Sequence, residues 1–304
     1  MTEFRRGIRV PKNMDALAKL AGQDSWWRDV LRDSSLLIGI RNEYLNVYWH
    51  GQSIFRVTLR NGEALPTTHP KYLLNPDLSS QVSLKGGAFQ FGAATMLTSK
   101  YVPGETLGKL KRAAKLFSGE EKQGVHSIAT SNPSVVDVEI ALQANDIPDI
   151  GSLPRVDLAA FEDGDRGDSV NLTFWEAKTL ANPEVRSSGK KNVVEQIRKY
   201  QKMIGAYGPQ ICESYAHIAR NFVDIAAMSD GHRKVSPSVR KVASEQAALS
   251  VDPSNVGLIV YGYDADQSKG QVKPLRERLE GELAKLGISR NRVRFKGDPK
   301  GLKL

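Results

Sequence analysis

The stretch VNLTFWEAK, from Val170 to Lys178, decides the fold and carries the most informative polar residues of the chain. Its β-branched and aromatic residues predict a buried strand. Side chains two residues apart on a strand point to the same face, so we expect Glu176 and Lys178 to lie side by side. The alternative interpretation is an exposed Glu-x-Lys pair on an ordinary strand.

A second strand is predicted just upstream, in RVDLAAFE from Arg155 to Glu162. The run DGDRGDS between the two strands, residues 163–169, has the composition of a turn. The strands are therefore expected to form a hairpin, which brings Asp157 and Glu176 within reach of one metal ion when the register places them opposite each other. Paired carboxylates are hard oxygen ligands that suit Mg²⁺ or Mn²⁺. With Lys178 orienting a water molecule or binding phosphate oxygens, this group of residues favours phosphodiester hydrolysis.

A helix is predicted from Asn192 to Ala206, because apolar residues recur there at helical spacing. Gln196 and Tyr200 are four residues apart and share one face of this helix. A glutamine on that partly apolar face is expected to meet a polar group of the site. A solvated glutamine beside a core tyrosine is the alternative.

Three short motifs now stand in a defined order: Asp157, then Glu176-Ala177-Lys178, then Gln196-x-x-x-Tyr200. Together they resemble the PD-(D/E)XK nuclease superfamily, in the branch similar to RecB-type nucleases, which adds the Q-x-x-x-Y helix. The first motif here is R-V-D rather than P-D, with Pro154 three residues before the aspartate.

The resemblance implies an α/β fold whose central mixed sheet is flanked by helices, a restriction-endonuclease-like core. It also implies that Asp157 and Glu176 are metal ligands and that Lys178 lies beside the attacking water. Gln196 and Tyr200 would line the substrate side. The implied activity is metal-dependent hydrolysis of nucleic acid, with DNA favoured over RNA, in restriction, antiphage defence or repair.

The same resemblance implies an acidic residue on a helix before the first motif strand. The segment SNPSVVDVEIALQAND, residues 131–146, offers Glu139 and Asp137, with Pro133 suited to a first helical turn. We prefer Glu139 as the additional catalytic residue. Both acids are alternatively solvated charges on an amphipathic helix.

The net charge of +9 suits a polyanionic partner. Basic residues gather around the Gln196 helix and are expected to bind nucleic acid: Lys190, Lys191, Arg198, Lys199 and Lys202. A solvated helix face would explain the same pattern. No Walker-type motif occurs, so the chain has no ATPase or helicase motor of its own. We expect a homo-oligomer or a partner subunit that supplies targeting or a motor. A non-catalytic nucleic-acid-binding or assembly subunit that keeps the nuclease fold is the alternative function.

Composition is that of a soluble globular protein, with 40% hydrophobic and 25% charged residues. No apolar run approaches the ~20 residues of a membrane helix, and the N-terminus lacks the apolar core of a signal peptide. A cytoplasmic location without membrane contact is expected. The single cysteine, Cys212, excludes an internal disulfide, and the five histidines have no metal-ligand spacing.

Two domains are predicted. Residues 1–120 contain a helical segment at 13–32 and then an antiparallel meander in LLIGI, YLNVYWH and SIFRVTL, with Asn61-Gly62 as a hairpin signal. The run SGEEKQG, residues 118–124, is expected to link the domains. Residues 125–304 form the nuclease-like domain and end in a βαβ extension, from VGLIVYGYD through a helix at 274–286 to RVRFK.

Overall fold

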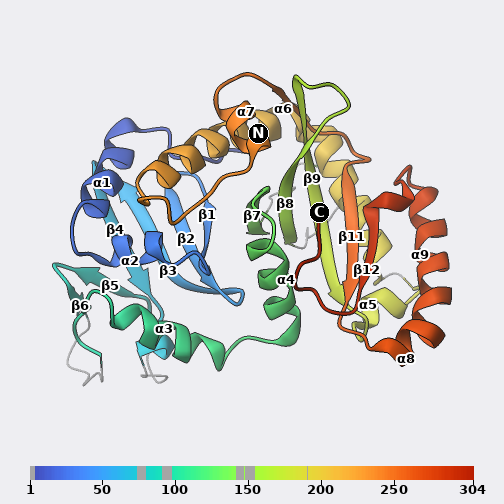
Figure 1. The fold of residues 1–304 in the computed structure, drawn as a ribbon, viewed down its shortest axis with the longest axis horizontal. Coiled ribbons are helices and arrows are strands. Elements are labelled where there is room, and N and C mark those ends of the chain that lie inside the picture. Colours follow the sequence, from blue (N-terminus) through green and yellow to red (C-terminus); the bar gives the residue numbers. More distant parts are fainter. Residues whose placement is uncertain (1–3, 74–79, 91–97, 142–146, 148–154, 190) are drawn as a thin grey trace.

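Two six-stranded sheets stand side by side in a mixed α/β fold (Figure 1). The structure, a computed structural model, describes residues 4–73, 80–90, 98–141, 147, 155–189 and 191–304. The first sheet is an antiparallel meander in sequence order, as the sequence predicted. Its strands are β1 (Leu37–Ile40), β2 (Tyr44–Trp49), β3 (Gln52–Arg60), β4 (Glu63–Thr68), β5 (Val82–Lys85) and β6 (Ala88–Gln90).

The helices that pack on the first sheet differ in one respect from expectation. The predicted helical segment at 13–32 is two helices, α1 (Pro11–Ala21) and α2 (Trp26–Arg32). The break is made by Ser25, which is extended and whose Oγ accepts a hydrogen bond from the backbone N–H of Arg28 at 3.2 Å. An N-cap serine of this kind begins a new helix. A 3-10 turn (Pro70–Leu73) and α3 (Thr106–Lys115) complete this half.

The second sheet is mixed, with strand order β12-β11-β9-β8-β7 and β10 paired to β9. Its strands are β7 (Val135–Ile140), β8 (Val156–Asp163), β9 (Ser169–Thr179), β10 (Ala248–Ser250), β11 (Val256–Tyr261) and β12 (Val293–Lys296). The β8–β9 hairpin and its turn are as predicted. Strands β9, β11 and β12 are parallel, and α9 (Lys273–Ala284) joins the last two, which confirms the βαβ end of the chain.

Helices cover both faces of the second sheet. Trp175 and Ala177 of β9 pack on one face with residues of α4 (Glu120–Thr130), whereas Phe174 lies on the opposite face with the side chains of α6 (Val193–Ala227). The remaining helices are short: α5 (Pro183–Arg186), α7 (Pro237–Ala243) and α8 (Ala265–Gln267), with a π turn (Ser268–Val272) and a 3-10 turn (Arg290–Arg292).

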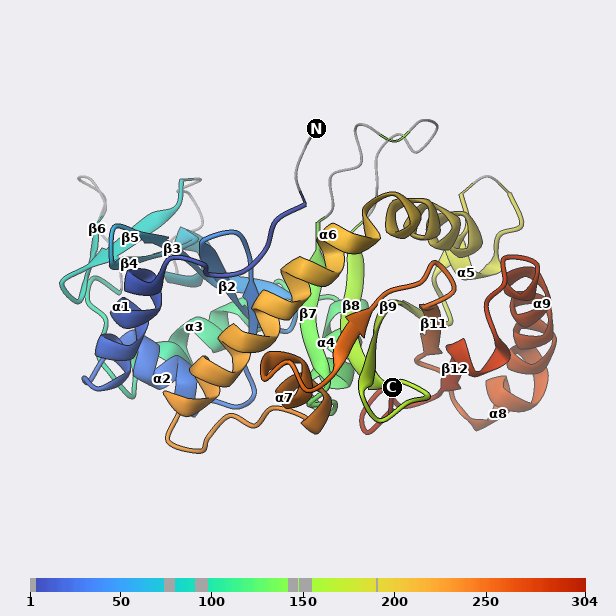
Figure 2. The ribbon, with the colours of Figure 1, turned by 90° about the horizontal axis from the view of Figure 1, so that it is seen from above.

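Helix α6 is longer than the sequence suggested. We expected a helix at 192–206, but a single helix of 35 residues continues past that end and runs through Pro209 to Ala227. A proline inside a helix removes one hydrogen bond and bends the axis without necessarily ending the helix. Figure 2 shows α6 changing direction and extending from the second sheet to the first. It therefore ties both halves together.

The expected interdomain link is also helical. Residues 120–124 form the start of α4, after the extended N-cap Gly119. Helix α4 packs against the second sheet, and β1 of the first sheet lies beside β7 of the second. Tight packing at Gly124 fixes α4 here, because a Cβ atom on this residue would lie 2.1 Å from the Tyr261 ring. Among the described helices, none has the length and apolar character needed to cross a membrane.

Candidate active site

The register of the second sheet brings Asp157 and Glu176 together. Leu158 of β8 pairs with Trp175 of β9, so the preceding residue, Asp157, lies across from Glu176. The Asp157 carboxylate accepts a hydrogen bond from the backbone N–H of Ala177 at 2.9 Å through Oδ2. The hairpin thus places the two acids next to each other, as expected.

Glu176 and Lys178 share one face of β9, which confirms the prediction from their spacing. Lys178 Nζ lies 2.9 Å from Glu176 Oε1, and both side chains are buried. The interpretation as an exposed surface pair is therefore wrong. Burial of this charge pair strengthens the attraction between its members, because water screens it less.

Helix α6 contributes Tyr200 to this pair. The Tyr200 hydroxyl lies 2.8 Å from Glu176 Oε2 and 3.2 Å from the carbonyl oxygen of Arg155, so its one hydrogen is shared between two acceptors. Glu176 is thereby held by a lysine at one oxygen and by a tyrosine at the other. The side chain needs this support because an ionised carboxylate is costly to bury alone.

Gln196 reaches the same group of residues through a different acid. Its Nε2 donates to Glu184 Oε2 at 3.1 Å, and its Oε1 is buried without a hydrogen-bond partner among the described residues. Glu184, on α5, also lies 3.2 Å from Lys178 Nζ. The glutamine is therefore linked to Lys178 through Glu184, and the solvated-glutamine interpretation is wrong.

Two acids of the site were missed by the sequence analysis. Besides Glu184, Glu121 at the start of α4 lies 3.8 Å from Lys178 Nζ. Glu121 is held in turn by Asn182, whose Nδ2 donates to its Oε2 at 2.7 Å. The sequence offers one weak signal for Glu184: Asn182-Pro183 begins a short helix with an acid in its first turn.

Glu139 lies on a strand, which corrects the expected helix. The pairs Val138–Leu158 and Ile140–Val156 flank it in β7 and β8, so Glu139 lies opposite Asp157. The β-branched residues of VVDVEI explain the error, because short apolar spacings fit a helix and a strand alike. Glu139 contacts Arg155 at 3.5 Å and Lys122 at 3.8 Å. Three strands thus present Glu139, Asp157 and Glu176 in a row.

Asp137, the alternative to Glu139, is not a solvated charge. Its carboxylate is buried and forms ion pairs with Arg6 and Arg41. Because both of its oxygens are engaged in this network, Asp137 is a structural acid and no candidate for contact with substrate.

Crowding of the acids alters their proton affinities. Loss of hydration and the charge of Glu176 raise the pKa of Asp157 well above its ordinary value, and the charge of Glu139 adds to this rise. Loss of hydration also raises the pKa of Glu176, against the opposing effect of Lys178. Perturbed carboxyl groups of this kind gather at functional sites more often than elsewhere.

Lys178 remains protonated in this environment. Burial opposes its charge, but Glu176, Asp157 and Glu121 together raise the pKa of its ammonium group above the ordinary value. Lys178 is therefore a buried cation held among three acids, Glu176, Glu184 and Glu121.

The basic residues on α6 are arranged differently from the prediction. Arg198 and Lys202 are exposed and each lies two residues from a site-facing residue, Gln196 or Tyr200, which is about 200° around a helix. They project from the side of α6 that faces away from Glu176. Arg198 also lies 3.6 Å from Glu195. Lys191 is exposed before the helix, Lys199 lies on its flank, and Lys190 and Pro154 lie outside the described residues.

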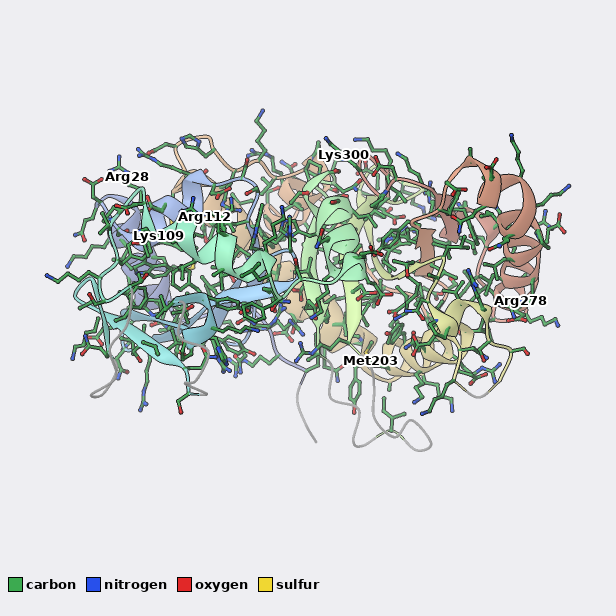
Figure 3. The ribbon with its side chains drawn as sticks, turned by 90° about the horizontal axis from the view of Figure 1, so that it is seen from below. Arg28, Lys109, Arg112, Met203, Arg278 and Lys300 are labelled. Carbon is green, nitrogen blue, oxygen red and sulfur yellow. The ribbon has the colours of Figure 1, made fainter. Side chains whose placement is uncertain are left out.

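Positive charge is spread well beyond α6. Lys109 and Arg112 on α3 and Arg278 on α9 mark opposite ends of the molecule in Figure 3. Arg278 has a defined role, because its guanidinium donates to the carbonyl oxygens of Val185 and Arg186 and so holds the helix that carries Glu184.

In the described part of the chain, no group of three or more histidine, cysteine, aspartate or glutamate side chains has the arrangement of a metal site. A pair of carboxylates is nevertheless a suitable donor set for Mg²⁺, which keeps several waters and takes one or two protein carboxylates plus substrate phosphate. Within the described residues Asp157 Oδ1 accepts no hydrogen bond, and each Glu176 oxygen, with one partner, keeps a lone pair. The residues present therefore fit a hard divalent cation.

Comparisons of the chain with protein-family models, curated proteins and solved structures found no match.

Proposed function

We propose that the protein is a metal-dependent nuclease that hydrolyses phosphodiester bonds, with DNA as the favoured substrate. The observation that carries the proposal is the buried Lys178–Glu176 pair at 2.9 Å, directly across the sheet from Asp157. This arrangement is consistent with a restriction-endonuclease-like core of the PD-(D/E)XK type. Restriction, antiphage defence and repair are the roles in which we place such an activity.

Asp157 and Glu176 are the residues we assign to bind Mg²⁺ or Mn²⁺. When bound, such an ion neutralises charge on the phosphate and makes a nearby water more acidic. The raised pKa values of both carboxyls support the assignment, since each group lacks the positive charge that would fully offset its burial. Calcium is expected to support substrate binding without turnover.

Lys178 supplies the fixed positive charge of the proposed reaction. In the absence of substrate its ammonium group is shared among Glu176, Glu184 and Glu121. A bound phosphate offers Lys178 a further acceptor. The contact to Glu121 is the longest of the three, at 3.8 Å, so it is the one that a phosphate oxygen replaces most easily. Lys178 then pairs with a phosphate oxygen or orients the attacking water, while Glu176 keeps it in place.

Gln196 and Tyr200 hold the acids from the α6 side. Tyr200 fixes one oxygen of Glu176, and Gln196 fixes Glu184, leaving the Gln196 carbonyl oxygen without a partner among the described residues. We assign that oxygen to accept a hydrogen bond from the substrate, such as one from a nucleobase amino group or a sugar hydroxyl.

The test is cleavage of end-labelled single-stranded and double-stranded DNA and RNA by the purified protein, with Mg²⁺, Mn²⁺, Ca²⁺ or excess EDTA. We expect products with Mg²⁺ or Mn²⁺ alone, and loss of cleavage in Asp157→Asn and Glu176→Gln. Asp163→Asn is the matched control, because Asp163 lies at the far end of the same strand and forms an exposed pair with Lys241 at 3.4 Å. Undiminished cleavage in EDTA contradicts the proposal, as does wild-type activity in Asp157→Asn.

A further inference from the structure

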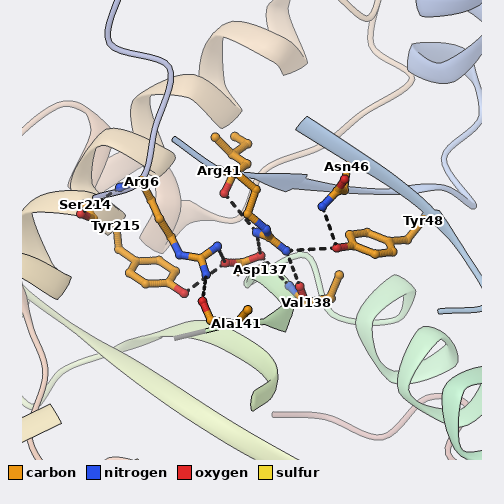
Figure 4. A network of polar contacts seen from close by, with 10 residues as sticks. Arg6, Arg41, Asn46, Tyr48, Asp137, Val138, Ala141, Ser214 and Tyr215 are labelled. Carbon is orange, nitrogen blue, oxygen red and sulfur yellow. Dashed lines mark hydrogen bonds and ion pairs between the residues drawn. The ribbon is translucent and has the colours of Figure 1, made fainter. Parts of the chain in front are cut away.

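A buried ionic network lies between the two halves of the chain (Figure 4). Asp137 of β7 accepts hydrogen bonds from two guanidinium groups, Arg6 through Oδ2 at 2.9 Å and Arg41 through Oδ1. Tyr215 of α6 adds a contact to Oδ2 at 3.2 Å. All three charged side chains are almost completely buried. One carboxylate thus holds two arginines that come from positions 131 and 96 residues away in the sequence.

Each arginine also binds a backbone carbonyl close to Glu139 in the chain, one within β7 and one directly after it. Arg41 Nη2 donates to the carbonyl oxygen of Val138 at 2.7 Å, and Arg6 Nη2 donates to that of Ala141 at 2.9 Å. The backbone N–H of Val138 donates to Asp137 Oδ1 at 2.8 Å. The backbone is therefore fixed on both sides of Glu139.

Glu139 needs such support, because its backbone has φ 52° although it lies within β7, one residue before the strand ends. A residue with a side chain adopts this left-handed conformation at a cost, and it persists only where the surroundings impose it. The conformation interrupts the alternation of β7 at the residue that lies opposite Asp157. Strain of this kind is found at functional sites more often than elsewhere.

Arg41 directly follows β1, and residues of the first sheet hold its side chain in place. Its Nη2 also lies 3.3 Å from the Tyr48 hydroxyl, which accepts a hydrogen bond from Asn46 at 3.1 Å. Gly39 leaves the necessary space, because a Cβ atom there would lie 2.9 Å from Arg41 Nη2 and 3.0 Å from the Tyr48 ring. Arg6 is anchored separately, since its backbone N–H donates to Ser214 Oγ of α6 at 3.2 Å.

We propose that Arg6 and Arg41 are positioning residues that hold residues 138–141 so that Glu139 faces Asp157, and that the N-terminal half of the chain thereby completes the catalytic site. The inference rests on the proposed nuclease function. Under this proposal the N-terminal half of the chain contributes to the geometry of the catalytic site, a role that its antiparallel meander alone does not indicate.

Three variants test the positioning role by different routes. Arg41→Ala removes the guanidinium. Gly39→Ala keeps every charge and hydrogen-bonding group and only displaces Arg41. Arg41→Met removes the guanidinium but keeps an unbranched apolar side chain in the space, while Asp137 stays paired with Arg6 at 2.9 Å, so that no buried charge is left without a partner. We expect each to lower kcat for DNA cleavage about 10- to 100-fold with little change in KM, since small misplacements of a catalytic group have effects of this size.

Arg233→Ala is the matched control. Arg233 is also a buried arginine that donates to backbone carbonyls, those of Val30 at 2.6 Å, Asp33 at 2.9 Å and Leu36 at 3.1 Å, none of which adjoins the acids. It is expected to lower stability without lowering kcat at a temperature where the variant is folded. A kcat loss in Arg233→Ala as large as in Arg41→Ala makes the effect one of general stability and overturns the proposal.

Two further measurements separate this inference from the proposed function. In a double-mutant cycle, Arg41→Ala is expected to have no further effect on kcat in a Glu139→Gln background, whereas additive losses contradict an action through Glu139. Amide hydrogen exchange, which needs no activity, is expected to rise at residues 136–141 in Arg41→Ala and Gly39→Ala but not in Arg233→Ala. Unchanged exchange there refutes the inference even if the enzyme cleaves DNA. If the wild-type protein cleaves nothing but the variants show this exchange pattern, the nuclease function is refuted, while the positioning of residues 138–141 by the arginines is supported.

Discussion

Asp157 and Glu176 lie across from each other on adjacent antiparallel strands, and the Asp157 carboxylate accepts a hydrogen bond from the backbone N–H of Ala177. Two acids so close, with a single lysine between several carboxylates, do not stabilise a fold efficiently, because like charges repel and burial removes hydration. Neutralising one of these acids should therefore raise the free energy of unfolding, whereas neutralising an exposed surface acid should not.

Asp157→Asn should make the protein more stable at pH 8. The pKa of Asp157 is raised in the folded state, so the unfolded chain releases this proton first and folding loses stability as pH rises above the ordinary value of 3.8. Asparagine removes that loss and still accepts the bond from Ala177. Urea unfolding should show a gain on the order of 1 kcal/mol at pH 8 that disappears near pH 4. Asp163→Asn, at an exposed position, is the control, and a less stable Asp157→Asn at pH 8 contradicts the argument.

Lys178→Met should fold but lose stability as pH rises. Without the ammonium group Glu176 keeps only the Tyr200 contact, so its pKa rises further and its ionisation costs more. The variant should be destabilised relative to wild type by on the order of 1 kcal/mol or more at pH 8, and less at pH 5.

The double variant Glu176→Gln with Lys178→Met is the control for that prediction. It removes the lysine and the carboxylate together, so its stability should depend less on pH between 5 and 8 than that of Lys178→Met. An equal pH dependence for the two proteins would show that Glu176 is not the group left uncompensated.

His126 should govern part of the acid sensitivity. Burial, and then the charge of nearby His50, lower the pKa of His126 to about 4 from an ordinary 6.5. The folded state holds the neutral ring, whose Nε2 donates to the Ser35 carbonyl at 2.8 Å. Its contribution is present above pH 6.5 and is lost as pH falls toward 4, by about 1.4 kcal/mol per pKa unit at most.

His126→Gln should therefore flatten the decline in thermal stability between pH 6.5 and 4. His232→Gln, at an exposed histidine, should not change it. Parallel stability curves for wild type and His126→Gln would contradict the assignment of this decline to His126.

The salt dependence of nucleic-acid binding should distinguish the basic residues on and beside α6 from Gln196. If Lys191, Arg198 and Lys199 contact phosphates, replacing each with methionine should weaken binding to all sequences and flatten its salt dependence by about 0.9 slope units per lost contact on duplex DNA. Gln196→Ala carries no charge change and should reduce cleavage with an unchanged slope. Unaltered affinity and slope in all three basic variants would mean that α6 presents a solvated face and that nucleic acid binds elsewhere, for instance along α3.

Local sequence patterns predicted the parts of the site that lie close together in the chain. The strand β9, its turn and the spacing of Glu176 with Lys178 follow from alternation and turn composition. The four-residue spacing of Gln196 and Tyr200 gave a shared helix face, and α6 does turn both toward the acids. Such periodicities act within one element, so they survive folding.

Contacts between distant segments were beyond these patterns. Glu121 reaches Lys178 from α4, and Arg6 reaches Asp137 across 131 residues of chain. No spacing rule connects such residues, because their proximity depends on how the two sheets pack. Glu139 shows a further limit, since its backbone is left-handed and the carbonyls on either side of it, those of Val138 and Ala141, are held by arginines distant in the sequence.

The most direct test of the account compares wild type and Lys178→Met in cleavage of labelled DNA with Mg²⁺, alongside binding of the same DNA with Ca²⁺. We expect that wild type cuts and that Lys178→Met binds with nearly unchanged affinity. The cleavage rate of Lys178→Met should fall by on the order of 10²-fold or more, as when one electrostatic group is lost from a preorganised site. Cleavage by Lys178→Met at the wild-type rate, or no cleavage by wild type on any DNA or RNA with Mg²⁺ or Mn²⁺, contradicts the account.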